Sequence, residues 1–253
     1  MRQTARNGLL CGSLTTLFAC SPPAPPPAAA PPPVPLTEVY ERSIRSAAVR
    51  DPGFAEPLRT IAPAQANVTV ATFTEWGAPP SPTQRLVWVS LPDQLRGFCH
   101  GKPDPVLAIQ QALGVPPQAT PSQPTHEWAV VTFTARRSAL FRPCPGGTDV
   151  AAPACGNTLA PAAIPGTRHA GTLDVATTRF LLDQIWSSDR VGFRSPAGEP
   201  DWGYPFTGMG WTYNWDPQAA SPVGVTEFVL RTGSTVTAPV AASPAAFCAA
   251  PAS

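Results

Sequence analysis

The feature that most restricts how this chain can fold is a proline-rich run that cannot form a core. The run "SPPAPPPAAAPPPVPL", residues 21–36, holds nine prolines in sixteen residues. Because proline lacks a backbone N–H and fixes φ, such a run adopts extended polyproline II. At about 3.1 Å per residue it would reach on the order of 50 Å. Residues 20–36 are therefore predicted to form a stalk, and a globular domain must follow them.

The residues before the stalk have the pattern of an export signal. Arg2 and Arg6 precede Gly8–Ala19, an uncharged stretch of twelve residues. This stretch is shorter than the roughly 20 residues that a membrane-spanning helix needs, and it is typical of a signal peptide. Residues 1–19 are predicted to be that signal peptide.

The end of the signal, Leu17-Phe18-Ala19-Cys20, resembles the lipobox of bacterial lipoproteins: a Leu, a tolerant position, a small residue and then Cys. The resemblance implies that Cys20 carries lipid, including palmitate, and that the membrane is the first partner. Ser21 is not the Asp associated with inner-membrane retention, so the outer membrane is the expected location. An ordinary cleaved signal with an incidental cysteine is the alternative.

Four of the six cysteines remain after the signal peptide and Cys20 are set aside. An even number of cysteines in an exported chain favours two disulfides. Four cysteines allow three pairings, and the turn-rich "PGGTDVAAPA" between Cys144 and Cys155 favours joining those two. Cys99 and Cys248 then form the second pair. No C-x-x-C spacing supports zinc, so neither a metal site nor a cofactor is predicted.

Hydrophobic periodicity and turn residues predict one α+β domain over residues 37–237. Helices are expected at 37–50, 104–114 and 174–188, and strands at 67–76, 84–91, 126–135, 138–142, 209–215 and 223–231. Because helices and strands do not alternate regularly, the sheet should be mostly antiparallel, with about three helices. The Ala/Pro-rich residues 238–253 are expected to be a tail tied to the domain by Cys248. In the helix at 174–188, four residues are expected to face inward: Leu181, Leu182, Ile185 and Trp186.

Six aromatic residues lie within Asp201–Pro217. Three of them would share one face of the strand at 209–215, where a core role against a helix such as 174–188 is favoured over ligand binding. These three are Trp211, Tyr213 and Trp215. The loop before the strand carries Asp201, Trp202 and Tyr204, which we expect at the rim of any ligand-binding site, since loops often carry function.

Glu227 is the most informative single residue, because it shares a strand face with Val225 and Val229, where a charge is costly unless it is paired or lies at a cleft. A carboxyl group of this kind is a candidate general acid or base. Its second carboxylate would be Asp201 or Asp216. The alternative, which we favour, is a structural ion pair with a cross-strand Arg85 or Arg142.

Composition excludes one class of partner. The chain has 17 Lys and Arg against 16 Asp and Glu, without a basic run, so nucleic acid is not expected. Two functions remain open. The favoured one is an envelope-anchored lipoprotein domain that binds a partner, such as glycan or an envelope protein, or serves a structural role. The alternative is a tethered hydrolase or transferase that acts on sugar-containing material through Glu227 and a second carboxylate.

Overall fold

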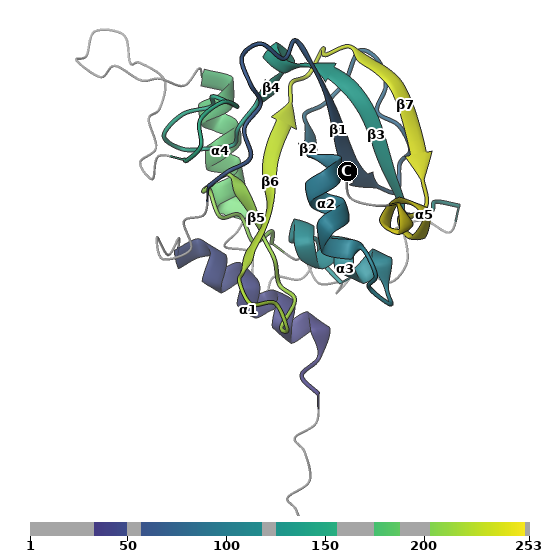
Figure 1. The fold of residues 1–253 in the computed structure, drawn as a ribbon. Helices are drawn as coiled ribbons and strands as arrows, with labels where there is room; N and C mark the ends of the chain where they lie inside the picture. Colours follow the sequence, from purple (N-terminus) through teal and green to yellow (C-terminus); the bar gives the residue numbers. More distant parts are fainter. Residues whose placement is uncertain (1–32, 50–56, 118–124, 156–174, 188–202, 251–253) are drawn as a thin grey trace, which may run out of the picture. The chain divides into compact units, whose positions relative to one another are not determined.

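The computed structural model describes residues 33–49, 57–117, 125–155, 175–187 and 203–250. Residues 34–253 belong to one compact unit. Within the described ranges this unit contains one antiparallel sheet of seven strands and five α-helices (Figure 1). The predicted α+β class and single mostly antiparallel sheet are confirmed, whereas the expected number of about three helices is too small.

The strand order of the sheet is β4-β6-β2-β1-β3-β7, with β5 paired to β6 beside β4. Long strands in the middle of this order, β1 and β3, pair residue for residue along eight positions. The strands are β1 (Asn67–Thr74), β2 (Val87–Ser90), β3 (Ala129–Arg136), β4 (Leu140–Phe141), β5 (Trp211–Tyr213), β6 (Val223–Leu230) and β7 (Val236–Ala242).

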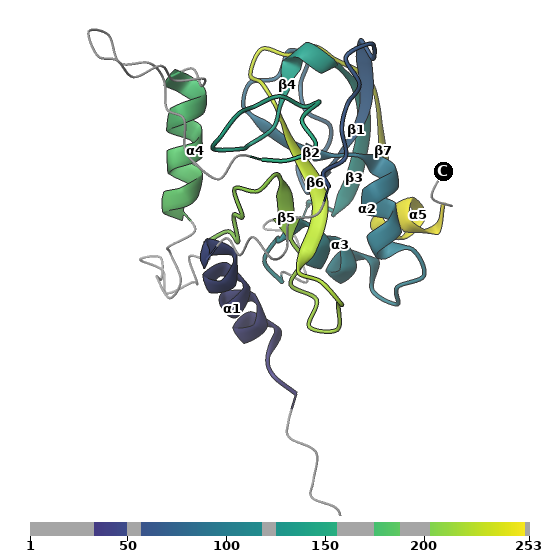
Figure 2. The ribbon, with the colours of Figure 1, turned by 60° about the vertical axis from the view of Figure 1, so that its left-hand side comes forward.

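The helices are α1 (Leu36–Val49), α2 (Pro92–Cys99), α3 (Pro105–Leu113), α4 (Val175–Ser187) and α5 (Pro244–Ala249). Three of them, α2, α3 and α5, contact one another and the sheet, and both ribbon views show them together at its lower end (Figures 1 and 2). The sequence predicted α1, α3 and α4. It missed α2 and α5 because they have only eight and six residues, too few to show a helical period.

The helix α3 follows the sequence signals closely. The Asp104 side chain accepts a hydrogen bond from the Leu107 amide at 3.0 Å, and Pro105 occupies the first turn. Gly114 ends the helix with φ of 67°, a left-handed conformation that glycine adopts without steric cost. These two caps fix where α3 ends, and that end forms part of the site described below.

The two faces of the sheet have different coverings. Side chains alternate along β1, so that Val68 and Val70 point into one core cluster and Ala71 into another. The second cluster joins the sheet to α2, α3 and α5 through Leu95, Ile109 and Phe247. Glu227 lies on this second face, because its cross-strand neighbour on β2, Ser90, pairs in turn with Ala71 on β1.

The segment expected to be a tail is part of the domain. Residues 236–242 form β7, which pairs with β3 at the edge of the sheet, and α5 follows it. An edge strand tolerates Pro239 because one side of its backbone needs no partner in the sheet. Five of its seven side chains are exposed, so the strand has little hydrophobic signal. The domain therefore does not end at residue 237.

The helix α4 does not bury all of the residues that were predicted to face inward. Leu181 is fully buried against Phe206, and Ile185 is partly buried, but Leu182 is 48% exposed. The expectation that Leu182 faces inward is wrong, since a surface helix buries only one stripe. The side chain of Trp186 lies outside what the structure describes. None of the described helices is both long and apolar enough to cross a lipid bilayer.

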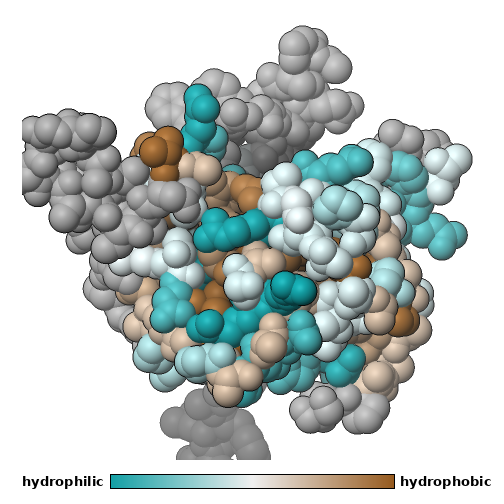
Figure 3. Space-filling model, turned by 90° about the horizontal axis from the view of Figure 1, so that it is seen from above, coloured by the Kyte–Doolittle hydropathy of each residue, from teal (hydrophilic) through white to brown (hydrophobic). Residues whose placement is uncertain are grey.

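Large hydrophobic side chains that are exposed are spread over several elements, with Leu36 and Val49 at the two ends of α1. Trp76 lies in the β1–β2 connection, Leu182 on α4 and Val240 on β7. The view from above shows hydrophobic residues in small areas between hydrophilic ones (Figure 3). Scattered residues of this kind are normal for a globular surface and do not define a docking face.

Candidate ligand-binding site

A cavity of about 390 Å³ lies between the sheet, the end of α3 and the segment that leads into β5. Its volume falls in the range usual for small-molecule sites. Its walls are mainly apolar or aromatic, with a few polar groups. The lining residues are Ala71, Thr72, Phe73, Trp88, Val89, Ser90, Leu113, Val115, Gln184, Tyr204, Thr212, Val225 and Glu227.

The register of β6 aims Glu227 into this cavity. Its Cα lies opposite that of Ser90 on β2, and its amide donates to the Gly210 carbonyl at 3.0 Å. Residues that are directly opposite in an antiparallel pair have Cβ atoms about 5 Å apart. Because Ser90 is small, the Glu227 carboxyl group has open volume beside it instead of a packed neighbour.

The Glu227 carboxyl group is buried without a hydrogen-bond partner. The residue is 2% exposed, and neither Oε1 nor Oε2 accepts a hydrogen bond. Burial raises the pKa of Glu227 to about 8, and the positive charge of Arg142 opposes this rise only partly. The group is therefore mostly protonated at neutral pH and can donate a hydrogen bond into the cavity.

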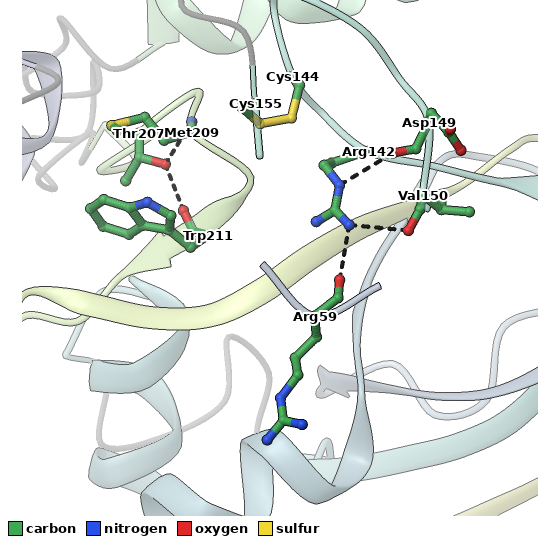
Figure 4. Close-up of a disulfide and its surroundings, with 9 residues drawn as sticks. All are labelled: Arg59, Arg142, Cys144, Asp149, Val150, Cys155, Thr207, Met209 and Trp211. Carbon is green, nitrogen blue, oxygen red and sulfur yellow. Dashed lines mark hydrogen bonds between the residues drawn. A yellow bond between two sulfur atoms is a disulfide. The ribbon is translucent and has the colours of Figure 1, made fainter. Parts of the chain in front are cut away.

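The ion pair predicted between Glu227 and Arg85 or Arg142 is not present among the described residues. The salt bridges between described residues join other pairs, and neither Glu227 nor Arg142 takes part in one. The Arg142 guanidinium instead donates to the backbone carbonyls of Arg59 at 2.9 Å, Val150 at 3.1 Å and Asp149 at 3.4 Å (Figure 4). Arg85 lies in the wall of a neighbouring hollow, in the connection between β1 and β2.

Arg142 acts on Glu227 only through its charge. It does not line the cavity, and its Nη1 atom has no hydrogen-bond partner. Its Cζ atom lies 4.8 Å from the centre of the Phe228 ring, so part of its stabilisation is a cation–π contact. Burial lowers the pKa of Arg142 to about 10, still high enough to keep the guanidinium charged at neutral pH.

Gly210 lies between the Cys144–Cys155 disulfide and the strand β6, which carries Glu227. Its φ is +78°, and a Cβ atom there would come within 2.8 Å of both Cys155 Sγ and Leu58 Cδ1. Only glycine fits this position. The Gly210 carbonyl accepts the hydrogen bond from the Glu227 amide. The Cys144–Cys155 disulfide, drawn in Figure 4, thus lies beside the segment that positions Glu227.

Both disulfides have the predicted pairing. Cys144 joins Cys155, and Cys99 joins Cys248 with a Cα–Cα distance of 5.4 Å. The second disulfide connects the end of α2 to α5. No group of three or more His, Cys, Asp and Glu side chains in the described ranges could hold a metal ion.

Of the three residues expected at the rim of a site, the structure describes only Tyr204. Its ring forms a wall of the cavity beside Trp88, with the two ring centres 6.0 Å apart. Its hydroxyl donates to the Leu113 carbonyl at 2.8 Å, and burial is the main reason why the pKa of Tyr204 is raised. Tyr204 is therefore a fixed wall rather than an exposed ring. Asp201 and Trp202 lie outside the described residues.

Asp216 does not supply the second carboxylate. It forms an ion pair with Lys102 at 3.5 Å, and its Oδ1 accepts from the Gln218 amide. It lines a different hollow, which lies beside α1. Among the described residues that line the cavity beside Glu227, Glu227 itself is the only acid.

The aromatic row of the β5 region belongs to the core, as favoured, but a different helix covers it. Trp215 meets Tyr40 of α1 edge to face at 5.7 Å, and its Nε1 donates to the Val115 carbonyl at 3.0 Å. Trp211 packs against Leu58 and Met209 instead. The expected cover, α4, packs elsewhere, since its Leu181 is buried against Phe206.

Several lining residues had no signal in the sequence. Ser90 and Trp88 lie on β2 and Phe73 lies on β1, and only the strand register brings them beside Glu227. Thr212 contributes a buried hydroxyl that bonds to the Ala112 carbonyl at 2.5 Å. Comparison of the chain with protein-family models, curated proteins and solved structures found no match.

Proposed function

We propose that this chain is an exported, lipid-anchored envelope protein whose folded domain binds a small, mostly apolar molecule in the cavity beside Glu227. One observation carries the binding function: an apolar cavity of about 390 Å³ holds a buried carboxyl group whose two oxygens have no hydrogen-bond partner. Buried polar groups are nearly always hydrogen-bonded, so one that faces a cavity is explained best by a ligand that supplies the partner.

The location of the protein is proposed from its first 36 residues. The lipobox-like end at Cys20 and the proline-rich stalk suit a domain held at a distance from a membrane, with Ser21 favouring the outer membrane. The two disulfides suit an oxidising compartment outside the cytosol. Replacement of Cys20 by Ala should release the protein from the membrane fraction, and unchanged fractionation would refute the anchor.

The binding function is tested by the fluorescence of N-phenyl-1-naphthylamine, an apolar probe that brightens in apolar sites. The wild-type protein should bind it, whereas Ser90→Leu, which places apolar volume beside Glu227, should weaken binding at least tenfold. Ser138→Leu is the matched control, because Ser138 is exposed in the turn before β4. Val115→Phe narrows the cavity at another lining residue and serves if Ser90→Leu does not fold. Equal binding by all folded variants would sink the proposal.

The enzymatic alternative has one observation in its favour, the raised pKa of Glu227, which suits a general acid. A hydrolase or transferase that uses two carboxylates needs a second acid, and the described lining supplies none beside Glu227. Release of nitrophenol from nitrophenyl glycosides, lost in Glu227→Gln, would support this alternative. We favour binding because the cavity has one carboxyl group and largely apolar walls.

A further inference from the structure

Resting on the binding function proposed above, we infer that the ligand is an apolar carboxylic acid, and that its carboxylate accepts a hydrogen bond from the carboxyl group of Glu227. Glu227 lines the cavity and neither of its carboxyl oxygens has a hydrogen-bond partner, so its proton is free to form one hydrogen bond to a ligand carboxylate. Hydrogen bonds to an ionised acceptor are shorter and stronger than neutral ones. The proton stays on Glu227, and no covalent bond forms or breaks.

The charges around the cavity favour an anion. With Glu227 protonated, Arg142 leaves a positive charge in the interior, and its Nη1 has no hydrogen-bond partner. The other donors of Arg142 are bonded to uncharged backbone carbonyls. Besides Glu227, the described acid whose charge acts on Arg142 is Asp149, which has a side chain that is 66% exposed and pairs with Arg137. Solvent therefore screens Asp149, whereas a bound carboxylate would lie in the interior.

Among the described residues that line the cavity, none other than Glu227 has an ionisable acidic or basic group that titrates near neutral pH. Of the neighbouring elements, β2 presents Ser90 and Trp88 to Glu227, and α4 presents the neutral Gln184. The segment before β5 presents Tyr204, whose hydroxyl is bonded to the end of α3. A cationic ligand would instead add a second positive charge to that of Arg142. Ser90, whose Cα is opposite that of Glu227, also lines the cavity, and we expect its hydroxyl to donate a second hydrogen bond to the carboxylate.

The rest of the cavity determines the body of the ligand. Phe73, Trp88, Leu113 and Val225 give it aromatic and aliphatic walls. Burial of apolar surface contributes roughly 25 cal/mol per Å², so these walls favour an alkyl or aryl chain over a sugar. A fatty acid of medium length has both parts: a carboxylate head and an apolar chain.

Three competitors that differ only in the head group test the inference. Decanoate, decanol and decylamine are titrated against the naphthylamine probe, on the full folded protein, at pH 6.5 and pH 9. At pH 6.5 decanoate is ionised and Glu227 is mostly protonated, so decanoate should displace the probe at a concentration at least tenfold below that of decylamine. At pH 9 Glu227 is mostly ionised and repels the carboxylate, so this advantage should shrink several-fold.

Glu227→Gln separates the head-group effect from a general effect of pH. The variant keeps an N–H donor but cannot ionise, so decanoate should bind it more weakly than wild type at pH 6.5, with affinity independent of pH. Tighter binding of decylamine, equal binding of all three competitors, or an unchanged pH effect in the variant would overturn the inference. If the probe itself does not bind, or binds without regard to Ser90→Leu, the proposed function fails instead.

Discussion

Glu227 should make the domain less stable as the pH rises, because the folded state holds a proton that the unfolded chain releases. Its pKa is about 8 in the folded protein, against an ordinary value of 4.5. The stability linked to its protonation is therefore fully present below about pH 4.5 and is lost progressively up to about pH 8. Above that pH the loss is complete, since the carboxyl group is then ionised in both states.

The magnitude follows from the two pKa values. Within the window the free energy of unfolding falls by about 1.4 kcal/mol per pH unit. Across the whole span from 4.5 to about 8, the loss is on the order of 5 kcal/mol. Domains of this kind are stable by only about 5 to 15 kcal/mol, so one residue should dominate the alkaline part of the profile.

Urea unfolding at pH 5, 6.5 and 8 measures this effect, with both disulfides intact. Glu227→Gln cannot ionise, so its stability relative to wild type should rise with each step in pH. Glu127→Gln is the control, because Glu127 is exposed just before β3 and should leave the wild-type profile unchanged. If Glu227→Gln and wild type gave parallel profiles, Glu227 would have an ordinary pKa, and its lack of partners would not describe the protein in solution.

Two further predictions concern the frame around the site. Removal of the Cys99–Cys248 disulfide by a double Cys→Ser change should lower the free energy of unfolding by about 5 kcal/mol in the chain-entropy model, against about 3 kcal/mol for Cys144–Cys155. The difference arises because the sequence separations are 149 and 11 residues. Equal losses in urea unfolding would contradict the loop-length argument. Trp215→Ala should cost about 3 to 5 kcal/mol, because the ring is 2% exposed; a loss under about 1 kcal/mol would place the ring outside the core.

Local signals in the sequence predicted the fold class, because they report interactions between near neighbours. The Asp104 cap and Gly114 end of α3 are read directly from the residue types. The disulfide pairing also followed from proximity, since only ten residues separate Cys144 from Cys155. Weak periodicity hid the short helices α2 and α5 and the exposed edge strand β7, whose stability comes from packing against the rest of the domain.

Only part of the candidate site could be predicted from the sequence, for a related reason. Alternation along one strand was enough to show that Glu227 faces the core, but its neighbours depend on strand pairing and chain crossovers. Asp216 was predicted as a possible second carboxylate, and the structure places it in an ion pair with Lys102 instead. Ser90 lies 137 positions from Glu227 in the sequence and is directly opposite it in the sheet.

The position of Glu227 is difficult to explain by stability alone. At pH 7 its buried carboxyl group makes the domain less stable by roughly 3 kcal/mol, from the gap between its two pKa values. A glutamine or a leucine on the same strand would avoid this cost. Carboxyl groups with a raised pKa occur often where a ligand or a reacting group meets them. A bound carboxylate that accepts a hydrogen bond from protonated Glu227 and is attracted by the charge of Arg142 would offset part of the cost, so the ligand should also stabilise the fold.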